Sequence, residues 1–290
     1  MTSKKRLIII LGLLVLVFAI IFMTSSYEDK IVSRKKVETV SDKYSNFKKV
    51  SYYKSINKER YVSYYENNKN LSFEKVVLYV NIGLDKEPYT YTRKADVSKN
   101  NQILVNKYHK LDQDYVPLDL EVIDSKYFIN AGRNDELKRI AKESFEKLSL
   151  DSIKNGTPVY GQSAYRSYDV QEFLFNEEVK NYGLDKALNN VAKPGYSEHQ
   201  TGLAIDVSST KSGNMLEFLN TKSYEWMINN AHKYGFILRY NKNKENIHGY
   251  INEPWHYRYV GVIIATDMHD NYSDLTYEEY YYQKIDKAKN

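Results

Sequence analysis

The chain has 290 residues, of which 42% are hydrophobic and 27% are charged, and its formal net charge is +5. This composition is typical of a globular protein and excludes a disordered chain. The absence of cysteine excludes disulfides, thiolate metal sites and thiol nucleophiles. The basic residues are not tied to any element that enters a nucleic-acid groove, so we expect no nucleic-acid partner.

A basic and then apolar segment opens the chain. Lys4, Lys5 and Arg6 precede an uninterrupted apolar run from Leu7 to Met23. The run has the length of a short membrane span and exceeds the usual core of a signal peptide. We therefore predict a membrane anchor over residues 1–26, with the rest of the chain outside the cell. Cleavage of this segment as a signal peptide, which would give a secreted protein, is the alternative.

The next segment, residues 27–70, is polar and lacks both Gly and Pro. It carries 11 basic and 6 acidic residues, a net charge of +5. We predict a basic, partly helical stalk. Such a stalk either lies against anionic lipid or wall polymer, or is simply solvated.

From residue 71 onward, apolar periodicity predicts alternating strands and helices. Strands are predicted over residues 73–84, 157–165, 202–207 and 236–240, with one or two more in 249–264. Helices are predicted over Asp135–Leu150, from Ser167 or Asp169 to Tyr182, and from about Ser223 to Gly235. Interspersed elements of this kind indicate a compact α+β or α/β domain. Residues 266–290 are predicted to form a polar tail.

The stretch YSEHQTGLAID, from Tyr196 to Asp206, is unusual for a buried strand. Alternation along the strand places Gly202, Ala204 and Asp206 on one face. Two small side chains beside an acid indicate that something bulky approaches that face. His199 precedes the strand in a turn that can direct it to the same side. The stretch is therefore either an ordinary buried strand or half of a metal site.

A third ligand is expected elsewhere, because a catalytic zinc needs three protein ligands and one open position. His256 is the best candidate among the other histidines. Glu253 lies three residues before it, and Pro254 between them forbids a normal helix and keeps Glu253 extended. Each residue alone has an ordinary surface or hydrogen-bonding interpretation. Their conjunction favours a metal hydrolase.

Three motifs resemble those of VanY-type zinc D-alanyl-D-alanine carboxypeptidases and of related tetrapeptide L,D-carboxypeptidases. SEHQTGLAID matches an S-x-H-x(6)-D pattern, EPWHYRYVG matches E-x-W-H, and SAYRSYDVQ has Arg and Gln five residues apart. The resemblance covers about residues 80–262. It implies an α+β catalytic domain, here over residues 71–265, with a central antiparallel sheet flanked by helices and zinc in a cleft on the sheet.

The resemblance also implies roles for individual residues. It implies that Zn²⁺ is held by three ligands, His199, Asp206 and His256. It implies a catalytic base and an oxyanion-stabilising cation, Glu253 and Arg166. It implies further contacts to the substrate, Gln171, Ser197 and Tyr240. One departure from the family pattern is His248, where a small polar residue is expected before Gly249.

The predicted function is that of a monomeric, membrane-anchored zinc carboxypeptidase that removes the C-terminal D-Ala from peptidoglycan stem peptides. D,D activity is preferred over L,D activity on tetrapeptide stems. An endopeptidase that cuts cross-links would need a cleft open at both ends. A non-catalytic wall-binding module is a further alternative, and the presence of Glu253 argues against it.

Overall fold

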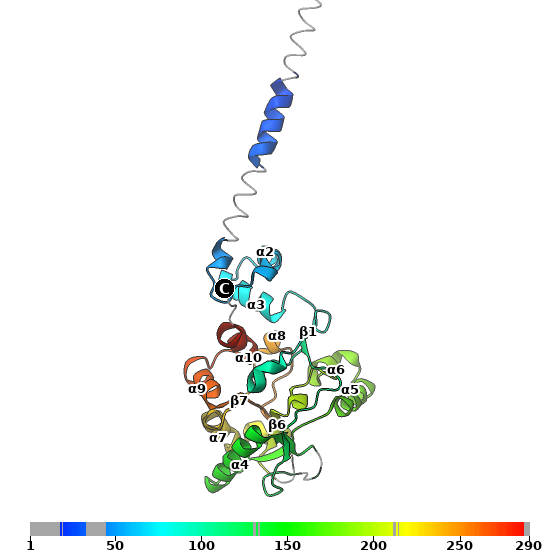
Figure 1. Ribbon diagram of the computed structural model, residues 1–290, viewed down its shortest axis with the longest axis vertical. Helices are drawn as coiled ribbons and strands as arrows, with labels where there is room; N and C mark the ends of the chain where they lie inside the picture. Colours follow the sequence, from blue (N-terminus) through cyan, green and yellow to red (C-terminus); the bar gives the residue numbers. More distant parts are fainter. Residues whose placement is uncertain are drawn as a thin grey trace, which may run out of the picture. The chain divides into compact units, whose positions relative to one another are not determined.

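The protein was examined as a computed structural model, which describes residues 18, 20–32, 45–129, 132, 134–210, 213 and 215–286 (Figure 1). The chain divides into two units, Met1–Val77 and Leu78–Asn290. Most of the predicted anchor, residues 1–26, lies outside the described residues. Among the residues that are described, no helix is both long and apolar enough to cross a membrane.

The first unit contains a small aromatic cluster inside the segment predicted as a stalk. A short 3-10 helix, η1 (Ser55–Asn57), leads into α2 (Lys58–Asn67). The ring of Phe47 lies 5.7 Å from that of Tyr61 and 5.1 Å from that of Phe73, measured between centroids. Phe47 and Tyr61 are fully buried. Part of the predicted stalk is helical, and its aromatic side chains pack against one another and against Phe73.

The strand predicted over residues 73–84 is wrong. This segment forms α3 (Phe73–Ile82). Val76 and Val80 are both fully buried and stand four residues apart, which is the spacing of one helical face. A short apolar run does not by itself distinguish a buried helix from a buried strand, and here the helix is formed.

A four-stranded sheet organises the second unit. Its order is β5-β6-β8-β7, and each neighbouring pair is antiparallel. The four strands are β5 (Tyr160–Ser163), β6 (Ala204–Ser208), β7 (Phe236–Leu238) and β8 (His256–Tyr259). Two small sheets lie outside it, formed by β1 (Arg93–Lys94) with β2 (His109–Lys110) and by β3 (Leu120–Val122) with β4 (Glu136–Lys138).

Helices surround this sheet, so the domain is the predicted mixture of helix and strand. In Figure 1, α5 and α6 lie together on one side of β6 and β7, and α7 and α9 lie on the other. The helices of this unit are α4 (Arg139–Lys154), α5 (Tyr168–Tyr182), α6 (Leu184–Asn190), α7 (Lys222–Asn230), α8 (Glu245–His248), α9 (Val262–Asn271) and α10 (Tyr277–Tyr280). Shorter helical turns are η2 (Val97–Gln102), η3 (Glu198–Thr201), η4 (Met215–Asn220), η5 (Ala231–Tyr234) and η6 (Tyr281–Ile285).

Local capping signals account for the helices that the sequence predicts best. The Ser167 side chain accepts a hydrogen bond from the backbone N–H of Val170 and begins α5, and Gly183 ends it. The turn η5 continues α7 and ends at Gly235, whose left-handed φ of 82° favours glycine. Helix α4 begins at Arg139 instead of Asp135, because residues 136–138 pair with β3 as strand β4.

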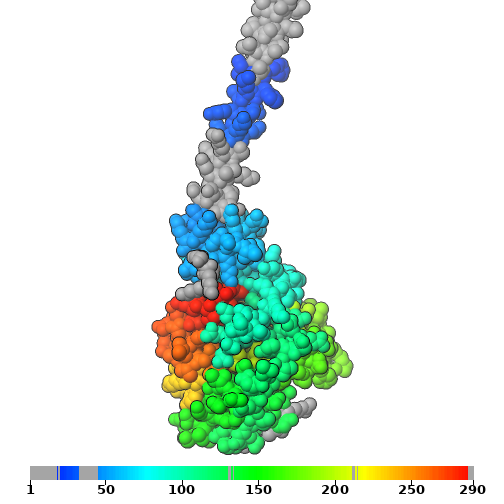
Figure 2. All heavy atoms as spheres, viewed as in Figure 1, coloured from blue at the N-terminus to red at the C-terminus, as the bar shows by residue number. Residues whose placement is uncertain are grey.

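A polar tail was predicted over residues 266–290, but its described part, residues 266–286, forms helices with buried side chains. Tyr277, Glu278 and Tyr282 are almost completely buried. The Tyr277 hydroxyl donates to the backbone oxygen of Gln102, and the Tyr282 hydroxyl pairs with Nε2 of His109. Tyrosine can be buried in this way because its ring is apolar while its hydroxyl finds a partner. Figure 2 shows the described part of the segment, in orange to red, as one continuous part of the surface of this unit.

Candidate active site

Two of the predicted ligands form a cross-strand pair. Asp206 on β6 lies directly opposite His256 on β8 in the antiparallel register. Directly opposed residues in a sheet place their side chains on the same face. Nδ1 of His256 lies 2.9 Å from Oδ1 of Asp206. The sheet therefore brings together two groups that are 50 residues apart in the sequence.

His199 reaches the same point from η3, the turn that precedes β6. Its Nδ1 lies 2.6 Å from the backbone oxygen of Ala164. A carbonyl only accepts hydrogen bonds, so Nδ1 carries the proton and Nε2 carries a lone pair. Nε2 lies 3.3 Å from Oδ2 of Asp206 and has no hydrogen-bond partner in the part of the chain that the structure describes.

These three side chains fit a bound zinc ion. One donor atom from each of His199, Asp206 and His256 lies within 4.8 Å of the others, and all three residues are buried. Two ligand atoms placed about 2.0–2.1 Å from a tetrahedral zinc lie roughly 3.3–3.4 Å apart. The 3.3 Å between Nε2 of His199 and Oδ2 of Asp206 matches that spacing. A cation between the two atoms would also give the unpartnered nitrogen a ligand.

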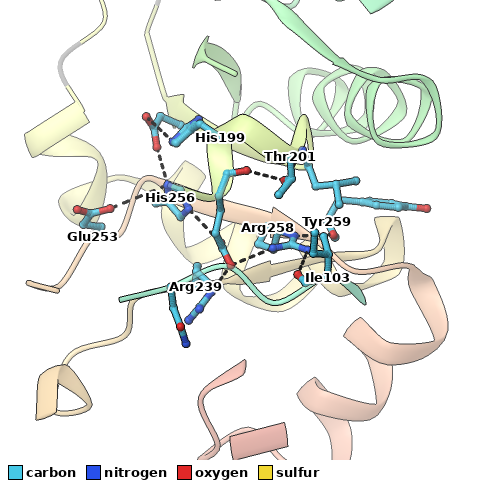
Figure 3. A network of polar contacts seen from close by, with 12 residues as sticks. Ile103, His199, Thr201, Arg239, Glu253, His256, Arg258 and Tyr259 are labelled. Carbon is cyan, nitrogen blue, oxygen red and sulfur yellow. Dashed lines mark hydrogen bonds and ion pairs between the residues drawn. The ribbon is translucent and has the colours of Figure 1, made fainter. Parts of the chain in front are cut away.

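The other ring nitrogen of His256 faces a residue that sequence reasoning missed. Nε2 of His256 lies 3.6 Å from Oε2 of Glu198, which is an ion-pair distance. Oε1 of Glu198 accepts from Arg239 and Arg258, each at 2.9 Å (Figure 3). A carboxylate behind a metal-binding imidazole fixes the ring's orientation and leaves its other nitrogen for the metal. Glu198 gave no signal in the sequence, because a lone glutamate in a turn is usually solvated.

Glu253 stands beside the candidate ligands on the irregular segment before β8. Its Oε2 lies 4.0 Å from Nδ1 of His256, and its backbone N–H donates to the oxygen of Tyr240. Figure 3 shows His199 from η3 converging with Glu253 and His256, which lie three residues apart on one stretch of chain. Burial raises the pKa of Glu253 to about 7. A carboxyl group tuned in this way can accept and release a proton near neutral pH.

Arg166 follows β5 and supplies a positive charge on the opposite side of Asp206. Its Nη2 lies 3.7 Å from Oδ2 of Asp206. The backbone N–H of Arg166 donates to the backbone oxygen of His199, so the two residues are joined through their main chains. The sequence placed Arg166 at the end of a strand, and the structure brings it to the site.

The remaining predicted residues line one small cavity, which has a volume of about 70 Å³. Gln171 donates from Nε2 to the oxygen of Ala192 at 2.8 Å, and its Oε1 is buried without a partner among the described residues. The Tyr240 ring stacks on His256 with 4.8 Å between centroids. The residues that line the cavity are Arg166, Gln171, Asn190, Val191, Ala192, Ser197, Glu198, His199, Tyr240, Tyr250, Glu253 and His256.

The charges in this site are strongly coupled. Burial lowers the pKa of His199 to about 4, and the charge of Arg166 acts in the same direction. Burial opposes the charged form of His256, yet Asp206 and Glu198 raise its pKa to about 9. Burial would likewise raise the pKa of Asp206, but the two histidines hold it well below its usual range. Asp206 is therefore ionised and His199 is neutral, which are the forms that bind a metal, whereas His256 carries a proton that a metal would displace.

Gly202 does not lie on strand β6, which begins at Ala204. The prediction that its small size makes room for a bulky group on the metal-binding face of the strand therefore does not explain this glycine. It adopts a left-handed φ of 67°, and a Cβ there would come within 2.8 Å of Leu120.

His248 does not point into the cavity. Its Nδ1 accepts from the N–H of Tyr250, its Nε2 pairs with the Asn241 oxygen, and its ring packs against Tyr240.

Comparison with known proteins decides the family. A family model described as VanY, D-alanyl-D-alanine carboxypeptidase, matches residues 134–262, which include all eight predicted site residues. The protein YodJ of Bacillus subtilis (strain 168) is 43% identical over 192 residues, which cover 65% of this chain and 69% of that protein. The chain belongs to the VanY family of carboxypeptidases. The resemblance seen in the sequence is therefore confirmed.

Solved structures of VanY-family enzymes share this fold. The LD-carboxypeptidase LdcB has 40% sequence identity and a TM-score of 0.61, with 66% of this chain and 90% of that chain covered. A variant of the D,D-pentapeptidase VanY from a VanB-type resistance cassette, in complex with Zn(II), has 31% identity and a TM-score of 0.52. That match covers 62% of this chain and 98% of the VanY chain.

Proposed function

We propose that this protein is a zinc-dependent D,D-carboxypeptidase that removes the C-terminal D-Ala from peptidoglycan stem peptides. The observation that carries the proposal is the buried convergence of His199, Asp206 and His256 beside the carboxyl group of Glu253. A VanY relative that binds Zn(II) supports the choice of metal. The family description, D-alanyl-D-alanine carboxypeptidase, supports the choice of substrate.

In this proposal His199, Asp206 and His256 hold the zinc. Zinc bound in such a site lowers the pKa of a coordinated water to about 7 and polarises a carbonyl group. Glu253 accepts the proton of the attacking water and later delivers it to the leaving amine. Its raised pKa suits both steps, because the carboxyl group can exchange a proton near neutral pH.

Arg166 would stabilise the negative charge that develops on the carbonyl oxygen of the scissile bond. A partly buried guanidinium held beside Asp206 needs little reorganisation when that charge appears. Gln171 and Ser197 line the same cavity and would hold the free terminal carboxylate, and Tyr240 would form one wall. Recognition of that carboxylate is what distinguishes a carboxypeptidase from an endopeptidase.

One comparison favours a second candidate, an L,D-carboxypeptidase acting on tetrapeptide stems. The LD-carboxypeptidase LdcB matches with 40% identity and a TM-score of 0.61, against 31% and 0.52 for the D,D-pentapeptidase VanY. The same metal, base and guanidinium would serve both reactions. The two activities differ in the stereochemistry of the residue before the scissile bond.

Mass spectrometry of defined stem peptides tests the proposal. The full chain is incubated with a pentapeptide ending in D-Ala-D-Ala and with the corresponding tetrapeptide, with and without a zinc chelator. Chelator-sensitive release of one D-Ala from the pentapeptide supports D,D activity, and release from the tetrapeptide alone supports L,D activity. Cleavage of neither peptide by zinc-loaded protein would sink both candidates.

We also propose that the enzyme acts outside the cell. The basic residues and apolar run at the start of the chain support an anchor there, and the stem peptides lie beyond the membrane. Labelling of intact cells with a membrane-impermeant reagent, followed by extraction with detergent, tests both the side and the attachment.

A further inference from the structure

Two fully buried arginines lie beneath the candidate zinc site. Arg239 follows β7, and Arg258 shares a face of β8 with His256, two residues earlier. Both have no exposed surface. A buried guanidinium is costly unless its charge is balanced and its donors are satisfied. The carboxylates that balance these two charges therefore determine whether the two arginines keep their positions beneath the candidate zinc site.

One balancing carboxylate is Glu198, which faces the candidate ligand His256. Glu198 accepts from both arginines through Oε1, and its Oε2 is directed at Nε2 of His256. One carboxylate cannot neutralise two guanidinium groups. Without another anion, the net positive charge would draw the electron density of Glu198 away from the imidazole.

The second carboxylate comes from Glu278 on α10, outside the region that the family model matches. Glu278 has no exposed surface. Its two oxygens accept from Nη1 and Nη2 of Arg239 at 2.9 and 2.6 Å, a paired geometry that fixes the guanidinium plane. The amide of Asn106 also donates to Glu278, at 3.1 Å. Two guanidinium and two carboxylate groups then balance.

The surroundings of Glu278 make this arrangement rigid. Tyr277 lies next to it in the chain, and its ring covers both Arg239 and Arg258 with 5.5 Å from each guanidinium carbon to the ring centroid. Its hydroxyl is fixed by the backbone of Gln102. The segment that was predicted to be a polar tail therefore covers the two buried arginines with the ring of Tyr277.

We propose that Glu278 is a positioning residue for zinc, acting through Arg239 and Glu198 on the imidazole of His256. It touches neither the metal donors nor the cavity. Its role is to hold Arg239, so that Glu198 keeps its geometry and its charge directed at Nε2, and Nδ1 of His256 stays available for the metal. The inference rests on the proposed function, because it concerns the same zinc site.

The test is the zinc affinity of the full chain, measured by competition with a chromophoric chelator. Loss of a group that supports a metal ligand typically weakens metal binding about 10–100-fold. Glu278→Gln keeps the shape of the side chain and removes its charge, and we expect its zinc dissociation constant to rise about tenfold. Glu278→Asp keeps the charge with a shorter reach, and we expect an intermediate value.

Glu279→Gln is the matched control. Glu279 is the next residue of the same helix and is also buried, but its carboxylate accepts from the N–H of Thr276 and does not reach Arg239. We expect its zinc affinity to equal that of the wild type within about twofold. Equal affinities of wild type and Glu278→Gln would overturn the inference. So would an equal loss in Glu279→Gln, which would indicate general loosening of α10.

Two further outcomes are decisive. If Glu278→Gln does not fold, Glu278→Asp replaces it. Weaker zinc binding by Glu278→Asp than by Glu279→Gln then supports the inference, and equal binding overturns it. If the wild-type chain itself binds no zinc, the proposed zinc chemistry fails. Wild-type zinc binding with unchanged affinity in every Glu278 variant would leave the proposed function intact and reject only the role of Glu278.

Discussion

Nε2 of His199 and Oδ2 of Asp206 face each other at 3.3 Å inside the protein. The proton of His199 is on Nδ1, where it is donated to the oxygen of Ala164, so the two facing atoms both carry lone pairs. Two electron-rich atoms at this distance repel unless a cation lies between them or a proton is shared. The fold therefore holds a pair of donors that a metal ion would stabilise.

The first prediction concerns metal removal at this pair. His199→Ala deletes one of three donors, and we expect the variant to retain less than about a hundredth of the wild-type zinc affinity. The zinc content after dialysis, measured by elemental mass spectrometry, checks this. Wild-type protein stripped by a chelator should regain activity when zinc is added. Full zinc retention by His199→Ala would contradict the assignment of this ligand.

Glu253→Gln tests the catalytic base separately from the metal. The change removes the proton-accepting oxygen while it preserves shape, so we expect kcat to fall by about 10²–10⁴. The zinc content should stay the same, because the structure places Glu253 beside the ligands and not among the three converging donors. Kinetics on a D-Ala-releasing peptide, together with zinc analysis of the same sample, give both values. A variant with unchanged kcat would show that Glu253 is not the catalytic base.

Arg166→Lys tests the oxyanion role. Lysine keeps the positive charge but loses the planar fork, so we expect kcat/KM to fall about 10–100-fold with zinc retained. Arg139→Lys is a control on a surface arginine that pairs with Glu121, with a side chain 62% exposed. Its kcat/KM should remain within about twofold of the wild type. Equal effects of the two changes on kcat/KM would exclude the proposed oxyanion role of Arg166.

Local sequence carries the signal for several elements that hold the candidate ligands. The strand around Asp206, the helix that begins after Ser167 and the turn at Gly235 follow from alternation, capping and a left-handed glycine. The register that sets Asp206 opposite His256 has no local signal, since 50 residues separate them. The sequence grouped the two residues only as candidate zinc ligands and through the family resemblance, and neither argument gives the strand register.

The support beneath the site could not be predicted from sequence. Arg239, Arg258 and Glu278 are charged, and charged residues are rarely buried unless they are paired. Their pairing is long-range, so periodicity shows each of them as an ordinary surface residue. The partners of the C-terminal tyrosines are also distant in the sequence, so residues 266–290 were predicted to form a polar tail. The helix α3 was missed for a different reason, because its short apolar run suits either a helix or a strand.

A buried lysine next to the cavity supplies a prediction on pH. Lys107 is 4% exposed, donates to the backbone oxygens of Leu188 and Gly249, and lies with Nζ 4.5 Å from the centroid of the Tyr250 ring. Burial lowers its pKa to about 8. In the unfolded chain the pKa of lysine is about 10.4. Below pH 8 both states carry the charge, and the cost of burying it is fully present.

Between about pH 8 and pH 10.4 the folded protein loses this proton while the unfolded chain keeps it. The unfolded state then binds more protons, so the free energy of unfolding rises with pH. Lys107→Met has no such titration. We expect the wild type to gain about 2 kcal/mol relative to Lys107→Met between pH 7.5 and pH 9.8, less than the full shift implies because these pH values do not span both pKa values. Urea unfolding of both proteins at pH 7.5, 9.0 and 9.8 measures the difference, in which groups common to both cancel. A difference that stays constant with pH would show that Lys107 does not titrate in this range.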